Sequence, residues 1–157
     1  MARYIGPKRR LSRREGIPLF GKDVKALERK GIVPPGQHGL GRRRRISEYG
    51  IQLRAKQRAK RLYGILERQF KLYFDKASKV KGATGLSMLQ NLETRLDNVV
   101  YRLGFAQSRM NARQIVTHGH IRVDGKKVTI PSFLLSAGAT IAIAPKLSDN
   151  TQVKKSL

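Results

Sequence analysis

The chain has 157 residues, of which 34 are Lys or Arg and only 10 are Asp or Glu, so its formal net charge is +24. A compact fold with this charge repels itself, whereas an ordinary soluble surface mixes both signs, so the composition indicates a polyanionic partner, most simply nucleic acid. The absence of cysteine excludes disulfides and thiolate metal sites, and no apolar run reaches the roughly 20 residues of a membrane-spanning helix.

Residues 1–45 are predicted to form a basic extended arm. They are rich in Arg, Gly and Pro and lack sustained periodicity, so alone they cannot bury enough apolar surface to offset chain entropy. We expect the arm to become ordered against its partner or against the helices that follow. Within it, residues 22–30 can form a short helix, residues 34–39 form a turn-rich loop, and residues 42–45 are four consecutive arginines.

Residues 46–85 are predicted to form a helical region. A helix over 46–63 has Ser47 as its N-cap, and a second helix covers 65–79 after a break at Gly64. The inner face of the second helix is expected to hold Leu66, Phe70, Tyr73, Phe74 and Ala77. A glycine-containing linker at 81–85 then separates this region from the next.

Residues 86–145 are predicted to form a small α+β module. One long helix is expected over 86–103, with Ser87 and Gln90 as a capping box, and a short helix follows over 109–118 with Ser108 as its N-cap and Gly119 as its stop. The period then changes to two: residues 121–128 read as a hairpin around an Asp-Gly turn, and residues 140–144 as a third strand. The fold class is thus α+β, with helices packed on a short antiparallel sheet and a polar tail over 146–157.

The sequence shows no catalytic, metal or cofactor site. His118 and His120 are two residues apart, but nothing nearby completes the three or four ligands that a metal needs. There is no phosphate-binding glycine loop, no nucleophile elbow and no convincing carboxylate pair, so we predict that the protein is not an enzyme. The helix over 46–63 is basic, but its other face is largely alanine and suits membrane insertion poorly.

Nucleic-acid binding is favoured by the second half of the chain. Arg109 and Arg113 are four residues apart on one helix face, and the adjacent hairpin adds further cations. Together, helix and hairpin would present a basic face to phosphates and base edges, although a helix face of this kind can also be merely solvated. Asp97 is expected to orient an arginine through an ion pair, while Tyr4 and Tyr49 are candidates for stacking on bases.

Two groups of motifs resemble a known family. Residues Arg95-Leu96-Asp97-Asn98-Val99-Val100-Tyr101-Arg102-Leu103-Gly104, Ser108-Arg109-Met110-Asn111-Ala112-Arg113-Gln114 and 118–128 are similar to the S-four RNA-binding domain. The first half is similar to the S-four family of small-subunit ribosomal proteins through Arg3-Tyr4-Ile5-Gly6-Pro7, Pro35-Gly36-Gln37-His38-Gly39, Ser47-Glu48-Tyr49 and the stretches 13–16, 52–53, 56–57 and 63–64.

The resemblance implies a structural, primary binder of small-subunit ribosomal RNA that nucleates assembly of the subunit body and contributes to translational accuracy. It implies a place in the ribosome, in the cytoplasm or in an organelle, beside other ribosomal proteins, including protein five at the messenger entry channel. No membrane and no homo-oligomer are required. Two departures are visible: the first two zinc-ligand positions of many relatives correspond to Arg9 and Ser12, which implies a zinc-free form, and relatives usually continue beyond the strand at 140–144.

Composition, spacing and resemblance together give the predicted RNA contacts. They are Arg3, Tyr4, Arg10, Arg13, Arg14, Gln37, His38, Arg42, Arg43, Arg44, Arg45, Tyr49, Arg54, Lys56, Arg58, Arg61, Arg95, Asn98, Arg102, Ser108, Arg109, Arg113, Gln114, His118, His120, Arg122, Lys126 and Lys127. Two alternatives remain open at this point: an RNA-modifying enzyme that uses the S-four domain for targeting, and a general RNA chaperone. The first requires a further catalytic domain, and the second would not distinguish folded ribosomal RNA from duplex DNA.

Overall fold

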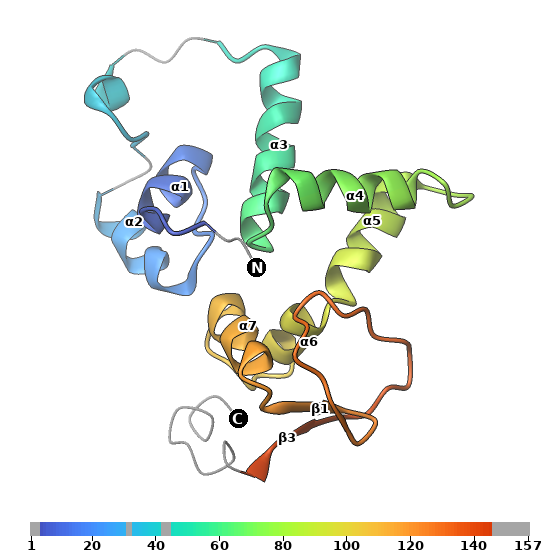
Figure 1. Cartoon of the computed structure of the whole chain (residues 1–157). Coiled ribbons are helices and arrows are strands. Elements are labelled where there is room, and N and C mark those ends of the chain that lie inside the picture. Colours follow the sequence, from blue (N-terminus) through green and yellow to red (C-terminus); the bar gives the residue numbers. More distant parts are fainter. Residues whose placement is uncertain (1–3, 31–32, 42–44, 146–157) are drawn as a thin grey trace. The chain divides into compact units, whose positions relative to one another are not determined.

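A computed structural model describes residues 4–30, 33–41 and 45–145 (Figure 1). The chain divides into two compact units, residues 1–70 and residues 71–157, with α4 containing the boundary. The α+β class is confirmed. The elements are α1 (Lys8–Glu15), a 3-10 turn at Gly21–Asp23, α2 (Val24–Lys30), a 3-10 turn at Gln37–Leu40, α3 (Glu48–Leu62), α4 (Glu67–Ala77), α5 (Thr84–Glu93), α6 (Leu96–Arg102), α7 (Arg109–Thr117), β1 (Ile121–Val123), β2 (Lys126–Lys127) and β3 (Ile141–Ile143).

The predicted extended arm is a partly helical segment, which corrects the expectation for residues 1–45. The short helix expected over 22–30 is present as α2, but α1 was not predicted. Polar contacts hold this segment: the buried hydroxyl of Ser12 donates to the carboxylate of Asp23 and accepts from the backbone N–H of Leu19 at 3.3 Å. Because the ordering comes from such contacts, apolar periodicity gave no signal for it.

Both predicted ends of α3 are confirmed. The Ser47 hydroxyl accepts from the Gly50 N–H at 3.3 Å, as an N-cap does. At the other end, the N–H groups of Gly64 and Ile65 donate to the carbonyls of Arg61 and Lys60, at 3.2 and 3.0 Å. This pairing needs a left-handed residue after the helix, and Gly64 supplies it with φ of 65°. Of the inner positions predicted for the second helix, Phe70, Tyr73 and Ala77 in α4 are buried, whereas Phe74 and Leu66, which precedes α4, are exposed.

The long helix predicted over 86–103 is two helices, α5 and α6, which corrects that expectation. Arg95 between them is extended, with φ of −64° and ψ of 137°. The N–H of Leu96 donates to the carbonyl of Phe133 at 2.8 Å, and the N–H of Asp97 donates to that of Pro131 at 3.1 Å. The first N–H groups of α6 are therefore paired with carbonyls of a later loop, where a continuous helix would pair them with carbonyls of its own preceding turn.

The capping box expected at Ser87 is also wrong. Helix α5 already begins at Thr84, its N-cap is Ala83, and no side chain caps it. Of the leucines in the segment 86–103, Leu92 and Leu96 are buried, whereas Leu89 and Leu103 are nearly half exposed. The two helices therefore do not share one continuous buried face.

The three strands form an antiparallel sheet in the order β2-β1-β3. The predicted hairpin is present, and its turn residues Asp124 and Gly125 have φ of 49° and 78°, as an Asp-Gly turn of this type requires. In β1, Ile121 and Val123 are buried while Arg122 between them is exposed. The sheet thus packs one face on the core and exposes cations on the other.

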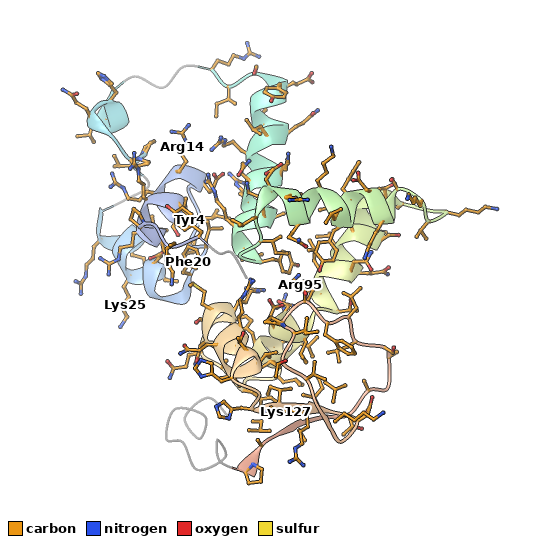
Figure 2. All side chains as sticks on the ribbon, viewed as in Figure 1. Tyr4, Arg14, Phe20, Lys25, Arg95 and Lys127 are labelled. Carbon is orange, nitrogen blue, oxygen red and sulfur yellow. The ribbon has the colours of Figure 1, made fainter. Side chains whose placement is uncertain are left out.

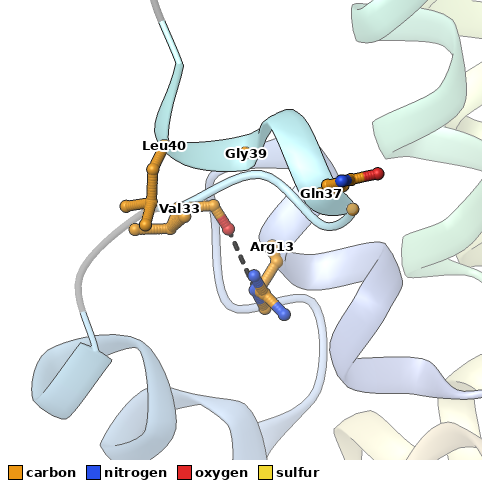
Figure 3. Close-up of a pocket in the computed structure, with 6 residues that line it drawn as sticks. Arg13, Val33, Gln37, Gly39 and Leu40 are labelled. Carbon is orange, nitrogen blue, oxygen red and sulfur yellow. Dashed lines mark hydrogen bonds between the residues drawn. The ribbon is translucent and has the colours of Figure 1, made fainter.

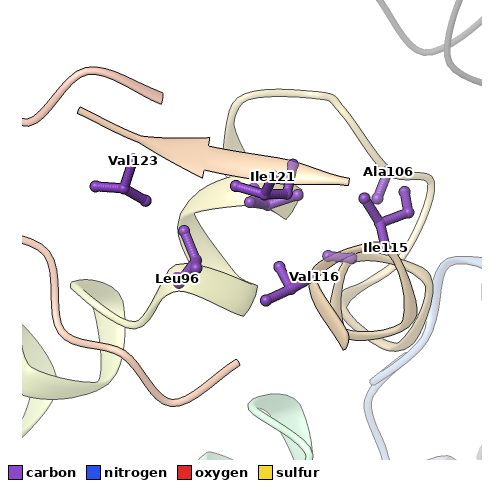
Figure 4. Close-up of a cluster of buried hydrophobic side chains, with 8 residues drawn as sticks. Leu96, Ala106, Ile115, Val116, Ile121 and Val123 are labelled. Carbon is purple, nitrogen blue, oxygen red and sulfur yellow. The ribbon is translucent and has the colours of Figure 1, made fainter. Parts of the chain in front are cut away.

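The core of residues 71–157 lies between α6, α7 and β1 (Figure 4). Helix α7 runs from Ser108, whose hydroxyl caps it through the Asn111 N–H at 3.2 Å, to the predicted stop at Gly119. The buried members of the core are Leu96, Val100, Ala106, Ala112, Ile115, Val116, Ile121 and Val123. Burial of one face of α7 directs its opposite face, with Arg113 and Gln114, away from this core. Within the described residues, no helix has the length and apolar character needed to cross a membrane.

Candidate nucleic-acid interface

The arginine stripe of α3 surrounds a buried carboxylate of α1. Arg54 donates to Glu15 Oε1 at 3.1 Å, Arg61 also donates to Oε1, and Arg58 donates to the Glu15 backbone carbonyl at 3.1 Å. The side chain of Glu15 is fully buried, while the three arginines are partly exposed. In the structure these arginines join α3 to α1, and their predicted contact with RNA stays a prediction. One carboxylate cannot neutralise three guanidinium groups, so the cluster keeps a positive charge.

Arg13 holds the loop that follows α2. Its Nε donates to the Val33 carbonyl at 2.9 Å and its Nη2 to the Pro34 carbonyl at 3.2 Å (Figure 3). Beside it lies a shallow pocket of about 300 Å³, lined by Arg13, Val33, Gly36, Gln37, Gly39 and Leu40. A Cβ at Gly39 would lie 2.1 Å from the Pro34 carbonyl oxygen, so glycine is required there. The predicted contacts Gln37 and His38 are exposed on this loop.

Arg9 and Ser12, which correspond to the first two zinc-ligand positions of many relatives, do not suit a zinc ion. Arg9 carries a cation, with its Nε 4.0 Å from Asp23 Oδ1, and the hydroxyl of Ser12 donates to the same carboxylate. Zinc sites in proteins use thiolate, imidazole or carboxylate ligands, and a guanidinium beside the ion would repel it. The carboxylate of Asp23 therefore joins α1 to the turn before α2 without a metal.

Two lysines of α3, Lys56 and Lys60, form ion pairs with Glu67 at the start of α4. Their effect on the pH dependence of stability can be tested. Hydrogen bonds from Lys56 and Lys60 lower the pKa of Glu67 below its ordinary value of 4.5, against a slight opposing effect of burial. A lowered carboxyl pKa stabilises the fold above about pH 4.5, and this contribution disappears as the pH falls through the lowered value. We expect the Glu67 carboxyl to titrate below 4.5 by NMR.

The variants Lys56→Ala and Lys60→Ala should each move the Glu67 midpoint upward. Lys76→Ala, which removes an exposed lysine nine residues further along α4, is the control and should leave the midpoint in place. An equal midpoint in all four proteins would contradict the two ion pairs. The effect on stability should be small, because half of the Glu67 side chain is exposed.

Arg95 lies inside the second unit at the break between α5 and α6 (Figure 2). Its guanidinium contacts Asp97 through two hydrogen bonds, Nε to Oδ1 at 3.0 Å and Nη2 to Oδ2 at 2.7 Å, and Nη1 donates to the Tyr73 hydroxyl at 2.7 Å. Burial opposes its charge, but Asp97 and Tyr73 outweigh that cost and raise the pKa of Arg95. The prediction that Asp97 orients an arginine is confirmed, whereas the prediction that Arg95 contacts RNA is corrected, because Arg95 is only 3% exposed.

Asn98 is likewise buried and hydrogen-bonded, so it cannot serve as the direct RNA contact that we predicted. Its Nδ2 donates to Glu93, and its Oδ1 accepts from Arg109 Nε at 2.8 Å. Arg102, on the same helix, donates to both carboxylate oxygens of Glu93 at 2.8 and 3.2 Å. Sequence reasoning missed Glu93. The one signal in the sequence was an acidic residue just before a helix that carries two predicted RNA contacts.

The end of α7 and the hairpin lie against each other. A Cβ at Gly119 would lie 2.1 Å from Cε and 2.8 Å from Nζ of Lys127, so this lysine packs against the backbone just after α7. The imidazole centroids of His118 and His120 are 6.2 Å apart at the same end. The predicted proximity of helix and hairpin is confirmed, and Lys126, Lys127 and Arg122 are all exposed.

The remaining predicted contacts fall into three classes. Arg3, Arg42, Arg43 and Arg44 lie outside the described residues. Ser108 has its hydroxyl engaged as the cap of α7. The other exposed members are Tyr4, Arg10, Arg14, Arg45, Tyr49, Lys56, Gln114 and His118, and Arg113 is half-buried. For all of these, RNA contact stays a prediction.

Comparison with known proteins decides the family. The model of the ribosomal protein S4/S9 N-terminal domain matches residues 3–93, and that of the S4 domain matches residues 94–141. The chain belongs to the ribosomal protein S4 family. It is 52% identical to small ribosomal subunit protein uS4 of Hydrogenovibrio crunogenus and 54% identical to that of Trichlorobacter lovleyi, in each case over the whole of this chain and 77% of the relative. The uS4 of Dictyoglomus turgidum is 57% identical, over 93% of this chain and 73% of the relative.

Membership of the S4 family agrees with two predictions made from the residues. The family and its named relatives are ribosomal proteins, which confirms that the chain is not an enzyme. The similarity to the S-four domain is likewise confirmed by the match that begins at residue 94. The two family models meet at 93/94 and the compact units divide at 70/71, so the predicted limits of arm, helical region, module and tail stay predictions.

Proposed function

We propose that this S4-family protein is a structural component of the small ribosomal subunit that binds ribosomal RNA. The observation that carries the proposal is the internal use of acidic side chains. Six acidic side chains of the described residues bind neighbouring groups, and three of them, Glu15, Asp23 and Asp97, are buried, which leaves few acids on the surface to oppose the cations. The engaged carboxylates are Glu15, Asp23, Glu67, Glu93, Asp97 and Asp124.

The surface formed by α7 and the β1–β2 hairpin shows this most clearly. It presents Arg113, Arg122, Lys126 and Lys127. Asp124, an acidic residue in the turn of the hairpin, accepts a hydrogen bond from the Thr140 N–H at 2.8 Å. Phosphate oxygens can replace the missing counter-charge, and each neutralised phosphate releases a condensed cation. A rigid surface of this kind recognises the shape of folded RNA more than its sequence.

The finer functions that the family resemblance implies are part of the same proposal. Bridging RNA helices with a high positive charge would allow the protein to bind early and nucleate assembly of the subunit body, and to influence translational accuracy. We also propose contact with protein five at the messenger entry channel. The ribosome that holds the protein would be cytoplasmic or that of an organelle.

The α7–hairpin surface can be tested through the salt dependence of binding. Replacing Arg109 and Arg113 together with alanine should weaken binding to purified small-subunit ribosomal RNA. It should also reduce the slope of log affinity against log salt by roughly 1.4 to 1.8, because each of the two phosphate contacts contributes roughly 0.7 to 0.9. Filter binding across a salt series measures both quantities.

The matched control is Lys76→Ala with Lys79→Ala, which removes the same charge from two exposed lysines, one in the last turn of α4 and one just after it, both outside the predicted contacts. This pair should change the slope much less. Equal slopes for the two double variants would mean that the basic surface acts without a defined site. Equal affinity of the wild-type protein for duplex DNA and ribosomal RNA would favour the general RNA-chaperone alternative.

A further inference from the structure

The amide of Asn98 has a single possible orientation. Its Nδ2 donates to the Glu93 backbone carbonyl at 3.1 Å and to Glu93 Oε2 at 2.6 Å. Both groups only accept hydrogen bonds, so the amino end of the amide must face Glu93. The oxygen Oδ1 therefore points the other way, where it accepts from Arg109 Nε at 2.8 Å.

Arg109 is fixed by a second contact as well. The carbon at the centre of its guanidinium lies 4.6 Å from the centroid of the Tyr101 ring, within the range of a cation–π interaction. The hydrogen bond to Asn98 sets where the Nε edge lies, and the ring sets the plane of the group. An arginine held in this way has its guanidinium in a defined orientation, and a guanidinium fork suits a phosphate.

The geometry points to Asn98 as a positioning residue for RNA binding: Glu93 orients its amide, and the amide together with Tyr101 orients the Arg109 guanidinium toward RNA phosphate. This inference rests on the proposed binding of ribosomal RNA. Arg102 supports the arrangement as well, because it donates to both carboxylate oxygens of Glu93. The relay consists of Glu93, Asn98, Arg109 and Tyr101.

The relay raises affinity by ordering Arg109 before RNA arrives. A long side chain that is free in the unbound protein loses rotamer freedom on binding, and this loss weakens the complex. Arg109 has already lost that freedom in the folded protein. Removing the Asn98 side chain should therefore weaken RNA binding by about three- to tenfold, although Asn98 itself is 2% exposed and does not reach the RNA.

A double-mutant cycle in the full chain tests the relay. Asn98→Ala should lower the affinity for purified small-subunit ribosomal RNA in the wild-type background and have little further effect once Arg109→Ala is present. Asn98→Ala combined with Lys126→Ala is the control, and its two losses should add. Losses that add equally in both cycles would overturn the inference, because they would show a general effect of Asn98 on the fold.

Two measurements keep the test decisive. The Nε–H signal of Arg109 in the RNA-free protein should be resolved and slow to exchange in the wild type and lost in Asn98→Ala; an unchanged signal would overturn the relay even if the protein failed to bind RNA. If Asn98→Ala does not fold, Tyr101→Leu replaces it in the cycle, because it removes the ring beside the Arg109 guanidinium and leaves Asn98 in place. Its loss of affinity should likewise largely disappear once Arg109→Ala is present, and losses that add would count against the relay.

Discussion

The variant Glu15→Gln should lose about 2 to 3 kcal/mol of stability in the N-terminal unit. The substitution keeps the volume of the side chain but leaves Arg54, Arg58 and Arg61 without the carboxylate that they surround. Removing one partner of a fully buried ion pair costs roughly 3 to 5 kcal/mol. We expect less here because the arginines are partly exposed and water can hydrate them after the change.

Urea unfolding with hydrogen exchange of the α1 and α3 amides would measure this loss and locate it. The control is Glu28→Gln, which removes the same charge from an exposed position of α2. It should change stability by no more than about 0.5 kcal/mol. If the two variants were equally stable, Glu15 would not be the anchor between α1 and α3.

The variant Arg95→Met should be the more damaging of the two, with a loss of about 3 to 5 kcal/mol in the second unit. Methionine can fill much of the same space, but it leaves the carboxylate of Asp97 buried without a counter-ion and the Tyr73 hydroxyl without its partner. Arg95→Lys should also destabilise the protein, because an ammonium cannot reproduce the two parallel hydrogen bonds to Asp97.

Arg102→Met provides the matched control for Arg95→Met. Arg102 also pairs with a carboxylate, but its side chain is 58% exposed, so this loss should stay below about 1 kcal/mol. Adding Asp97→Asn to Arg95→Met should recover part of the stability, because the unpaired buried charge is then removed. Similar unfolding curves for the two methionine variants would show that the buried Arg95–Asp97 pair contributes no more to stability than the exposed Arg102–Glu93 pair.

The features predicted correctly from the sequence depend on local chemistry. Ser47 and Ser108 cap the helices that follow them, Gly64 and Gly119 end helices, and the Asp-Gly turn forms its hairpin. In each case the residue interacts with backbone only a few positions away. Such signals can be read directly from the sequence because the partner lies in the same short segment.

The features that sequence reasoning missed depend on partners far along the chain. Helix α1 is anchored by Glu15, whose arginine partners lie about forty residues later, and the break at Arg95 is set by backbone groups near residue 133. The same holds for the candidate site. Asn98 and Arg95 are polar residues on a basic segment and therefore looked like RNA contacts, but only the folded structure shows that both side chains face inward.

The break between α5 and α6 also constrains how the S4 domain can form during synthesis. Three backbone hydrogen bonds complete it, from Leu96, Asp97 and Leu135 to Phe133, Pro131 and Thr94. Until residue 135 has left the ribosome, these later groups are not available to Thr94, Leu96 and Asp97, and a continuous helix through residue 95, bonded within itself, has no competitor. The final arrangement of the arginine-bearing helices is therefore a late event on the nascent chain, and RNA would encounter a correctly shaped surface only after nearly all of the domain has been made.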